Sequence, residues 1–194
     1  MLINGQEKSA VDYSEMSPIE IFERINNHQL KGVMFHDSLI SLFDFLYLPG
    51  FKRWQMCQFK SESKERCKLK LYVMRNHHKL LKDAPDTKEE IIPEDWYQYT
   101  RFDVTPQLRR QYVESAFIKY KEWENKTKAL HEQCSKVLYD NGNVLDACKI
   151  QELAEDVEKN WLVSISTTSN SKLLDLILNL FMKCKNIFTR NTNK

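Results

Sequence analysis

Apolar and polar positions repeat with the period of an α-helix in several long stretches of the chain. The first begins at Ser17, which can cap the helix; Pro18 suits the first turn and Glu20 completes a capping box. We expect this helix to run to about Tyr47. Gly32 weakens its middle by about 1 kcal/mol relative to alanine, so a kink or a break at this point is compatible with the pattern. The face at helical spacing comprises Phe22, Ile25, Gln29, Val33, His36, Ile40 and Phe43.

A second helix is predicted after a tight turn at Leu48-Pro49-Gly50, from Phe51 to about Leu81. Its core stripe is apolar at both ends and polar in the middle. The predicted inward positions are Phe51, Trp54, Gln58, Glu62, Glu65, Leu69, Tyr72 and Val73. A polar band in the middle of a helix's core face is unusual, because buried carboxylates are costly unless they are paired or bound to a metal.

Two further helices follow a long connection at residues 82–105, which is long enough to cross the length of a bundle. Thr105 and Pro106 open the third helix, which we expect to end near Tyr139. Residues 140–143 form a turn, and the fourth helix should end near Ser164. The pattern thus predicts an all-α fold: a loose N-terminal arm at 1–16, a four-helix bundle at 17–165, and a linker with a short amphipathic fifth helix at 166–194.

The C-terminal segment SKLLDLILNLFMKCKNIF is the most apolar part of the chain. Asp175, Asn179, Lys183 and Asn186 form one polar stripe along it. It is too short and too often interrupted to span a bilayer. We expect a fifth helix packed against the bundle or in an oligomer interface, with a helix lying on a membrane surface as the alternative.

Composition narrows the class of protein. The chain has 194 residues, enough for one domain with a core, and only four glycines and five prolines. A net charge of +2 gives no strong field toward nucleic acid or a membrane. Five cysteines without a Cys-x-x-Cys pair, after an N-terminus without an apolar leader, indicate free thiols in the cytoplasm. Nucleotide-binding loops and hydrolase or zinc-protease motifs are absent from the sequence.

The stretch FDFLYLPGFKRWQMCQFKSESKER resembles the end of the first helix and the start of the second in ferritins, within a resemblance that covers residues 25–75. The order of the predicted elements, with one long crossover, is also that of ferritin-like bundles. The FHD…FDFL…GFKR pattern is further similar to small proteins of bacterial phages and mobile elements. The resemblance implies a ferritin-like four-helix bundle.

A ferritin-like di-iron centre needs carboxylates from two helices and Glu-x-x-His from the other two. The resemblance implies an incomplete centre here, because the fourth helix offers Asp156 and Glu158 but no histidine. The remaining ligand positions match Gln29 in the first helix, Glu62 or Ser63 and then Glu65 or Arg66 in the second, and Glu124 or, less well, Glu122 in the third.

A different cluster follows from the residues themselves. If the first hairpin is centred near residue 48 or 49, His36 lies level with Ser61 and Glu62, and Glu65 follows one turn later. Glu124 lies near the middle of the third helix, and a second histidine follows two turns further on. Imidazoles and carboxylates around one core suit iron, manganese or zinc. The candidate ligands are His36, Glu62, Glu65, Glu124 and His131.

Each candidate also has a structural interpretation. Glu62 and Glu65 lie among lysines and arginines and could form a solvated, salt-bridged face. His36 and His131 could be structural histidines, and Glu124 could lie on the surface. His77 and His78 would favour the negative end of the helix dipole.

Two functions remain open at this point. One is a ferritin-like bundle with an atypical or vestigial metal centre. The other is a non-enzymatic interaction protein, encoded by a phage or mobile element, that acts on a host protein through a helical surface. Partners are expected through that surface or the C-terminal helix, including further copies of the chain; nucleic acid and membranes are not expected. The sequence does not decide whether the protein is an enzyme.

Overall fold

A computed structural model describes residues 13–84 and 102–166, and only the backbone of residues 156–166. These residues contain helices and no strand, which confirms the predicted all-α class. The helices are α1 (Pro18–Phe45), α2 (Pro49–His77), α3 (Pro106–Asp140) and α4 (Val144–Ser166). None of these described helices is apolar over a length that could cross a bilayer.

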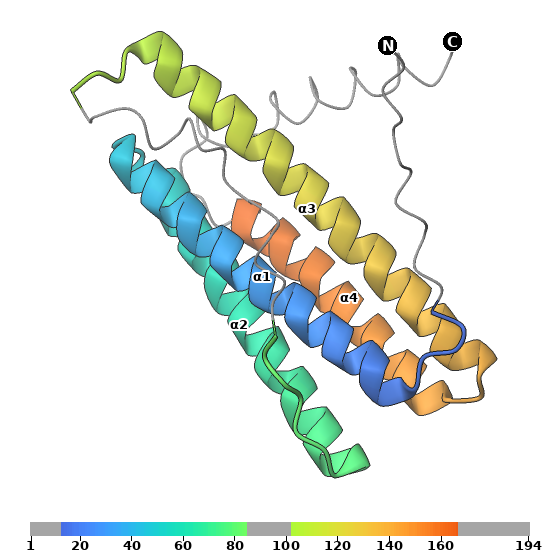
Figure 1. Cartoon of the computed structure of the whole chain (residues 1–194). Coiled ribbons are helices and arrows are strands. Elements are labelled where there is room, and N and C mark those ends of the chain that lie inside the picture. The colour runs from blue at the N-terminus through green and yellow to red at the C-terminus, as the bar shows by residue number, and fades with distance from the viewer. Residues whose placement is uncertain (1–12, 85–101, 167–194) are drawn as a thin grey trace, which may run out of the picture.

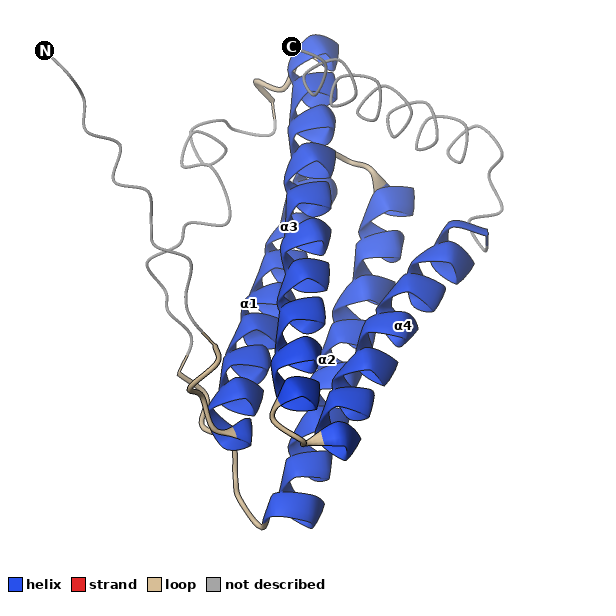
Figure 2. Cartoon of the chain, turned by 90° about the vertical axis from the view of Figure 1, so that its right-hand side faces the viewer, coloured by secondary structure: helices blue, strands red, loops and turns tan. Residues whose placement is uncertain are grey.

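The helices pair as two hairpins, α1 with α2 and α3 with α4, and α1 then contacts α3 while α2 contacts α4 (Figure 1). Ring contacts show how α2 and α3 are oriented relative to each other. Phe51 and Trp54 near the start of α2 both lie against Phe117 in the first half of α3. Helices α2 and α3 therefore run in the same direction. In the side view, α4 diverges from α3 toward its C-terminal end (Figure 2).

The predicted starts of α1 and α3 are confirmed in their local chemistry. Ser17 Oγ accepts a hydrogen bond from the Glu20 backbone N–H at 3.4 Å, and the Glu20 carboxylate accepts one from the Ser17 N–H at 2.8 Å. This reciprocal capping box stabilises the first turn of α1. Thr105 Oγ1 likewise accepts from the Leu108 N–H at 3.2 Å. Helix α1 continues through Gly32 without a break.

The first turn lies earlier than predicted. Pro49 and Gly50 belong to the first turn of α2, and the chain reverses at residues 46–48, where Tyr47 has a φ of 54°. Proline favours the first helical position because its fixed φ is helical and its missing N–H would have no partner there. The hairpin is consequently centred near Tyr47, and this offset changes which residues face one another.

Helix α2 also ends earlier than predicted, at His77, because His78 adopts the left-handed conformation that closes the helix. The following chain folds back onto the hairpin. Asp83 accepts hydrogen bonds from Asn26 of α1 at 3.1 Å and from Lys70 of α2 at 2.9 Å, and it also pairs with Arg66. The start of the predicted crossover is thus bound to both helices.

The core consists of two apolar clusters with a polar layer between them. The cluster near the α1–α2 turn includes Phe35, Trp54 and Phe117, and the cluster at the other end includes Phe22 and Leu69. All the predicted inward positions of α2 are buried except Tyr72, which is half-buried. The buried polar side chains near the middle are Gln29, His36, Gln55, Gln58, Glu62, Glu65, Thr127 and His131.

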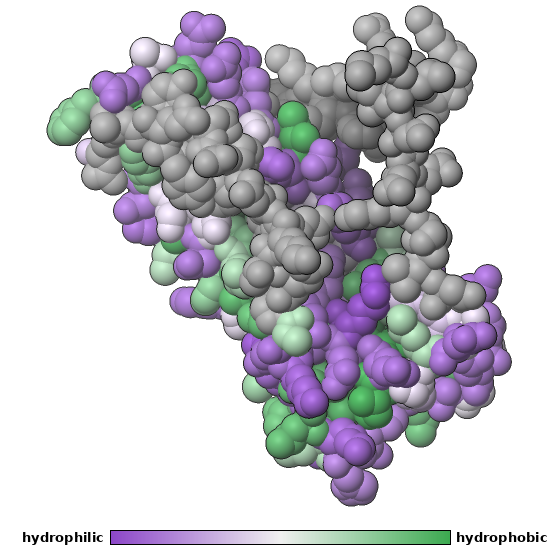
Figure 3. All heavy atoms as spheres, viewed as in Figure 1, coloured by the Kyte–Doolittle hydropathy of each residue, from purple (hydrophilic) through white to green (hydrophobic). Residues whose placement is uncertain are grey.

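The described surface in Figure 3 is mostly hydrophilic, with apolar side chains scattered between charged ones. Tyr13, within the expected N-terminal arm, is buried at one end of the bundle beneath the Arg24 guanidinium, 4.9 Å from the ring centroid. The C-terminal linker and fifth helix, predicted at 166–194, lie outside the described residues apart from Ser166.

Candidate functional site

The middle of the polar layer holds three glutamates from two helices. Glu62 and Glu65 lie one turn apart on α2, and Glu124 lies on α3. The side chain of Glu62 lies directly over Gly32 of α1: a Cβ atom at Gly32 would be 3.1 Å from Glu62 Oε1. The absence of a side chain at Gly32 therefore makes room for a buried carboxyl group between α1 and α2.

Glu62 is 8% exposed, and its Oε1 atom has no hydrogen-bond partner in the part of the chain that the structure describes. Burial raises the pKa of Glu62 to about 8, and the nearby charges of Glu124 and Glu65 raise it further in the same direction. Burial also raises the pKa of Glu124, which the neighbouring Tyr120 hydroxyl partly offsets. The three carboxyl groups thus form one electrostatically coupled cluster.

Glu65 is 2% exposed and accepts a hydrogen bond from Lys68 Nζ at 3.2 Å. The alternative that Glu62 and Glu65 form a solvated face is therefore wrong, although Glu65 does keep one ion pair of the expected kind. The basic residues around them lie at the rim of the layer, and the carboxyl groups point inward.

His36 is buried as predicted, but its predicted position level with Ser61 and Glu62 is wrong. Its Nδ1 atom lies 2.8 Å from Gln55 Oε1, and its ring lies against Phe35 and Tyr120. The hairpin is centred near Tyr47 and not at residue 48 or 49. Each residue of α1 therefore faces an α2 residue about one helical turn closer to the start of α2 than predicted. Burial lowers the pKa of His36 to about 4, so the ring is neutral.

His131 is 2% exposed, and its Nε2 atom has no hydrogen-bond partner among the described side chains. Burial lowers its pKa to about 4. It lies two turns beyond Glu124 on α3, about 10 Å along the helix axis. His131 is therefore set apart from the three glutamates along the bundle.

Sequence reasoning missed His28, on the same face of α1 as Gly32 and His36. Its Nε2 atom lies 2.7 Å from Thr127 Oγ1, and its ring stacks on Trp123 with centroids 4.3 Å apart. The spacing of four residues from His28 through Gly32 to His36 was the available signal. These histidines flank the glutamates on the α1 side.

A separate buried carboxylate, Asp146, joins α4 to α2. It accepts a hydrogen bond from the Tyr72 hydroxyl at 2.8 Å and lies 2.9 Å from His77 Nε2. The prediction that His77 favours the negative end of the helix dipole did not include this contact with Asp146. These contacts of Asp146 join the two helices at the end of the bundle far from Glu62.

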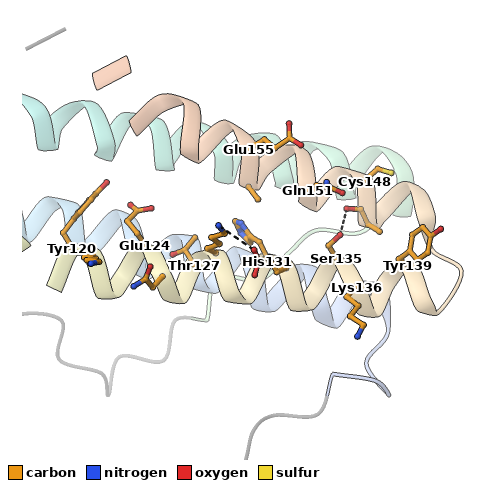
Figure 4. A pocket seen from close by; sticks show the side chains of 16 residues that line it. Tyr120, Glu124, Thr127, His131, Ser135, Lys136, Tyr139, Cys148, Gln151 and Glu155 are labelled. Carbon is orange, nitrogen blue, oxygen red and sulfur yellow. Dashed lines mark hydrogen bonds and ion pairs between the residues drawn. The ribbon is translucent and has the colours of Figure 1, made fainter. Parts of the chain in front are cut away.

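A cavity of about 720 Å³ lies between α3 and α4 (Figure 4). Glu124 and His131 both line it, so two of the predicted site residues face open space as well as the polar layer. On α3, Thr127 and Ser135 lie along the same wall. On α4, Cys148, Gln151 and Glu155 form the facing wall.

The cluster is acidic, and Glu62 Oε1 is a buried oxygen without a partner among the described residues. Within residues 13–84 and 102–155, no three His, Cys, Asp or Glu side chains lie close enough to one another to hold an ion. An ion at the three glutamates would therefore need their side chains to move. Asp156 and Glu158, the fourth-helix candidates, have side chains outside the described residues.

Comparisons with protein-family models, with curated proteins and with solved structures found no match to this chain.

Proposed function

We propose that this bundle binds a hard divalent cation, manganese or iron(II), through Glu62, Glu65 and Glu124. The observation that supports this most strongly is Glu62: a buried carboxyl group whose Oε1 has no hydrogen-bond partner within residues 13–84 and 102–155, and which is coupled to two further carboxyl groups. Buried polar groups in folded proteins nearly always have partners, so an oxygen of this kind calls for a ligand.

Electrostatics favours a cation as that ligand. Three carboxylates in one core repel one another and lose hydration, which is why Glu62 holds its proton to about pH 8. A divalent ion replaces that proton and neutralises the repulsion among all three groups. Buried charges are stable in proteins when they are paired or coordinate a metal.

The donor atoms favour a hard ion. Carboxylate oxygens suit magnesium, calcium and manganese, whereas imidazole suits zinc, copper, iron and nickel. The histidines are set apart from the three glutamates: His36 is hydrogen-bonded to Gln55, and His131 lies two helical turns from Glu124. Of the expected metals, manganese therefore fits these donors best, and iron is kept because the carboxylate-rich centres of ferritin-like bundles hold it. A bound manganese or iron ion would supply Lewis acidity or one-electron chemistry in the core.

Access is through the cavity between α3 and α4, because Glu124 lines both the cavity and the cluster. The direction of the helices, with α2 and α3 parallel, agrees with the single long crossover of ferritin-like bundles. That agreement and the residue 25–75 resemblance support the proposal that the chain is a divergent ferritin-like protein.

The test is metal-dependent unfolding of chelator-treated protein. Added Mn²⁺ or Fe²⁺ should raise Tm, because a ligand that binds only the folded state stabilises it by about 2.7 kcal/mol at one hundred times Kd. The variant Glu62→Gln, Glu124→Gln should lose this response. Glu122→Gln, at an exposed position on α3, is the matched control and should keep it. An equal response in the double variant would contradict the proposed site.

A further inference from the structure

The groove between α3 and α4 is larger than an ion needs. Its cavity is about 720 Å³, and its walls are mostly apolar. They include Tyr120 and Tyr139 at its two ends and Ala147 and Ala154 on α4. A groove of this volume has room for side chains from another segment of polypeptide.

We propose that the occupant of this groove is the segment 172–188 of the same chain, folded back as a helix along α4. This inference is independent of the metal site. Its first support is sequence: residues 167–171 read TTSNS, a composition that ends helices, and residues 172–188 read KLLDLILNLFMKCKNIF, the most apolar run in the chain.

The second support is length. The α4 wall of the groove runs from Ala147 to Glu155, and α4 ends at Ser166, about 16 Å beyond Glu155. A helix over 172–188 is about 25 Å long. Returning antiparallel to α4 from a turn at 167–171, it reaches past Glu155 to the level of Cys148. The segment therefore matches the groove it would cover.

Cysteine labelling tests the proposal on the full chain. Cys148 lines the groove and is exposed in the described chain, as are Cys57 and Cys67 on α2, away from the groove. A docked segment should slow maleimide modification of Cys148 by about tenfold relative to a chain ending at Ser171, measured site by site by mass spectrometry. Cys57 and Cys67 should react equally in both chains.

A second variant covers the case in which the shortened chain folds poorly. The double variant Ile177→Lys, Phe181→Lys in the full chain changes the face opposite the polar stripe and should expose Cys148. The control Asn179→Lys lies on the polar stripe and should leave Cys148 protected. Rapid modification of Cys148 in the unaltered full chain would overturn the proposal. Protection that increases with protein concentration would also overturn it, because the segment would then come from a second copy.

Discussion

Glu62 is the residue on which the account depends, and its titration can be observed through stability. In the folded chain its pKa is raised to about 8 from an ordinary value of 4.5. Between these values the folded state holds a proton that the unfolded state releases. The free energy of unfolding therefore falls as pH rises from 4.5 to 8 and is lowest, for this group, above pH 8.

Glu62→Gln removes this effect, because glutamine resembles the protonated acid. In metal-free protein we expect the variant to be more stable than the unaltered chain by about 5 kcal/mol at pH 9, and by less than about 1 kcal/mol at pH 5, since one pKa unit is about 1.4 kcal/mol. Urea unfolding at both pH values measures the difference. Glu122→Gln should show no such dependence; an equal effect of Glu62→Gln at both pH values would mean that Glu62 is not buried as described.

The buried histidines change the stability with pH in the direction opposite to Glu62. The pKa values of His36 and His131 are lowered to about 4 from 6.5, so the unfolded chain takes up protons that the folded chain does not. Their contribution to stability is complete above pH 6.5 and is lost as pH falls toward 4. Together with Glu62, they place the stability maximum of the metal-free protein near neutral pH.

Gly32 has a different role, which a double-mutant cycle measures. Gly32→Ala gains about 1 kcal/mol of helix propensity, but the new methyl group lies 3.1 Å from Glu62 Oε1 and displaces that side chain. In a Glu62→Ala background we expect the full gain; with Glu62 present, we expect a smaller gain or a loss. Identical effects of Gly32→Ala in the two backgrounds, measured by urea unfolding, would show that the glycine does not accommodate Glu62.

At the scale of elements, α4 is held to α2 by Asp146. Asp146→Ala removes the acceptor for Tyr72 and the partner of His77. It leaves a partly buried hydroxyl group without its partner, so we expect a loss of about 2 kcal/mol in the free energy of unfolding. Glu152→Ala, exposed on the same helix, should change stability by less than about 0.5 kcal/mol. Equal losses in the two variants would show that the Asp146 contacts do not hold α4.

The elements also show what the sequence could predict. Capping residues set the starts of α1 and α3, and the apolar–polar–apolar stripe of α2 predicted its buried positions. These signals are local. The pairing of α1 with α2 depends on the turn, and taking Pro49 for a turn residue instead of a first helical residue moved His36 away from its true neighbour, Gln55. An error of one or two residues in the position of a turn changes the predicted partner of every residue along both helices.

For the whole molecule, the sequence predicted the acids at the centre but not their surroundings. Glu62, Glu65 and Glu124 are coupled as expected from their inward positions. The contact between Gly32 and Glu62, and the cavity beside Glu124, depend on how two hairpins pack and on where α4 diverges. No periodic pattern in one helix encodes those distances, so they could not be predicted from the sequence.

The central claim, a cation held by the buried acids, is tested most directly by the metal content of untagged protein purified without chelator. Elemental mass spectrometry should find near-stoichiometric manganese or iron in the unaltered chain and in Glu122→Gln, and little in the Glu62→Gln, Glu124→Gln variant, with all three equally folded by circular dichroism. Metal-free protein that also fails to take up manganese or iron on reconstitution, or equal metal in the double variant, would contradict the account.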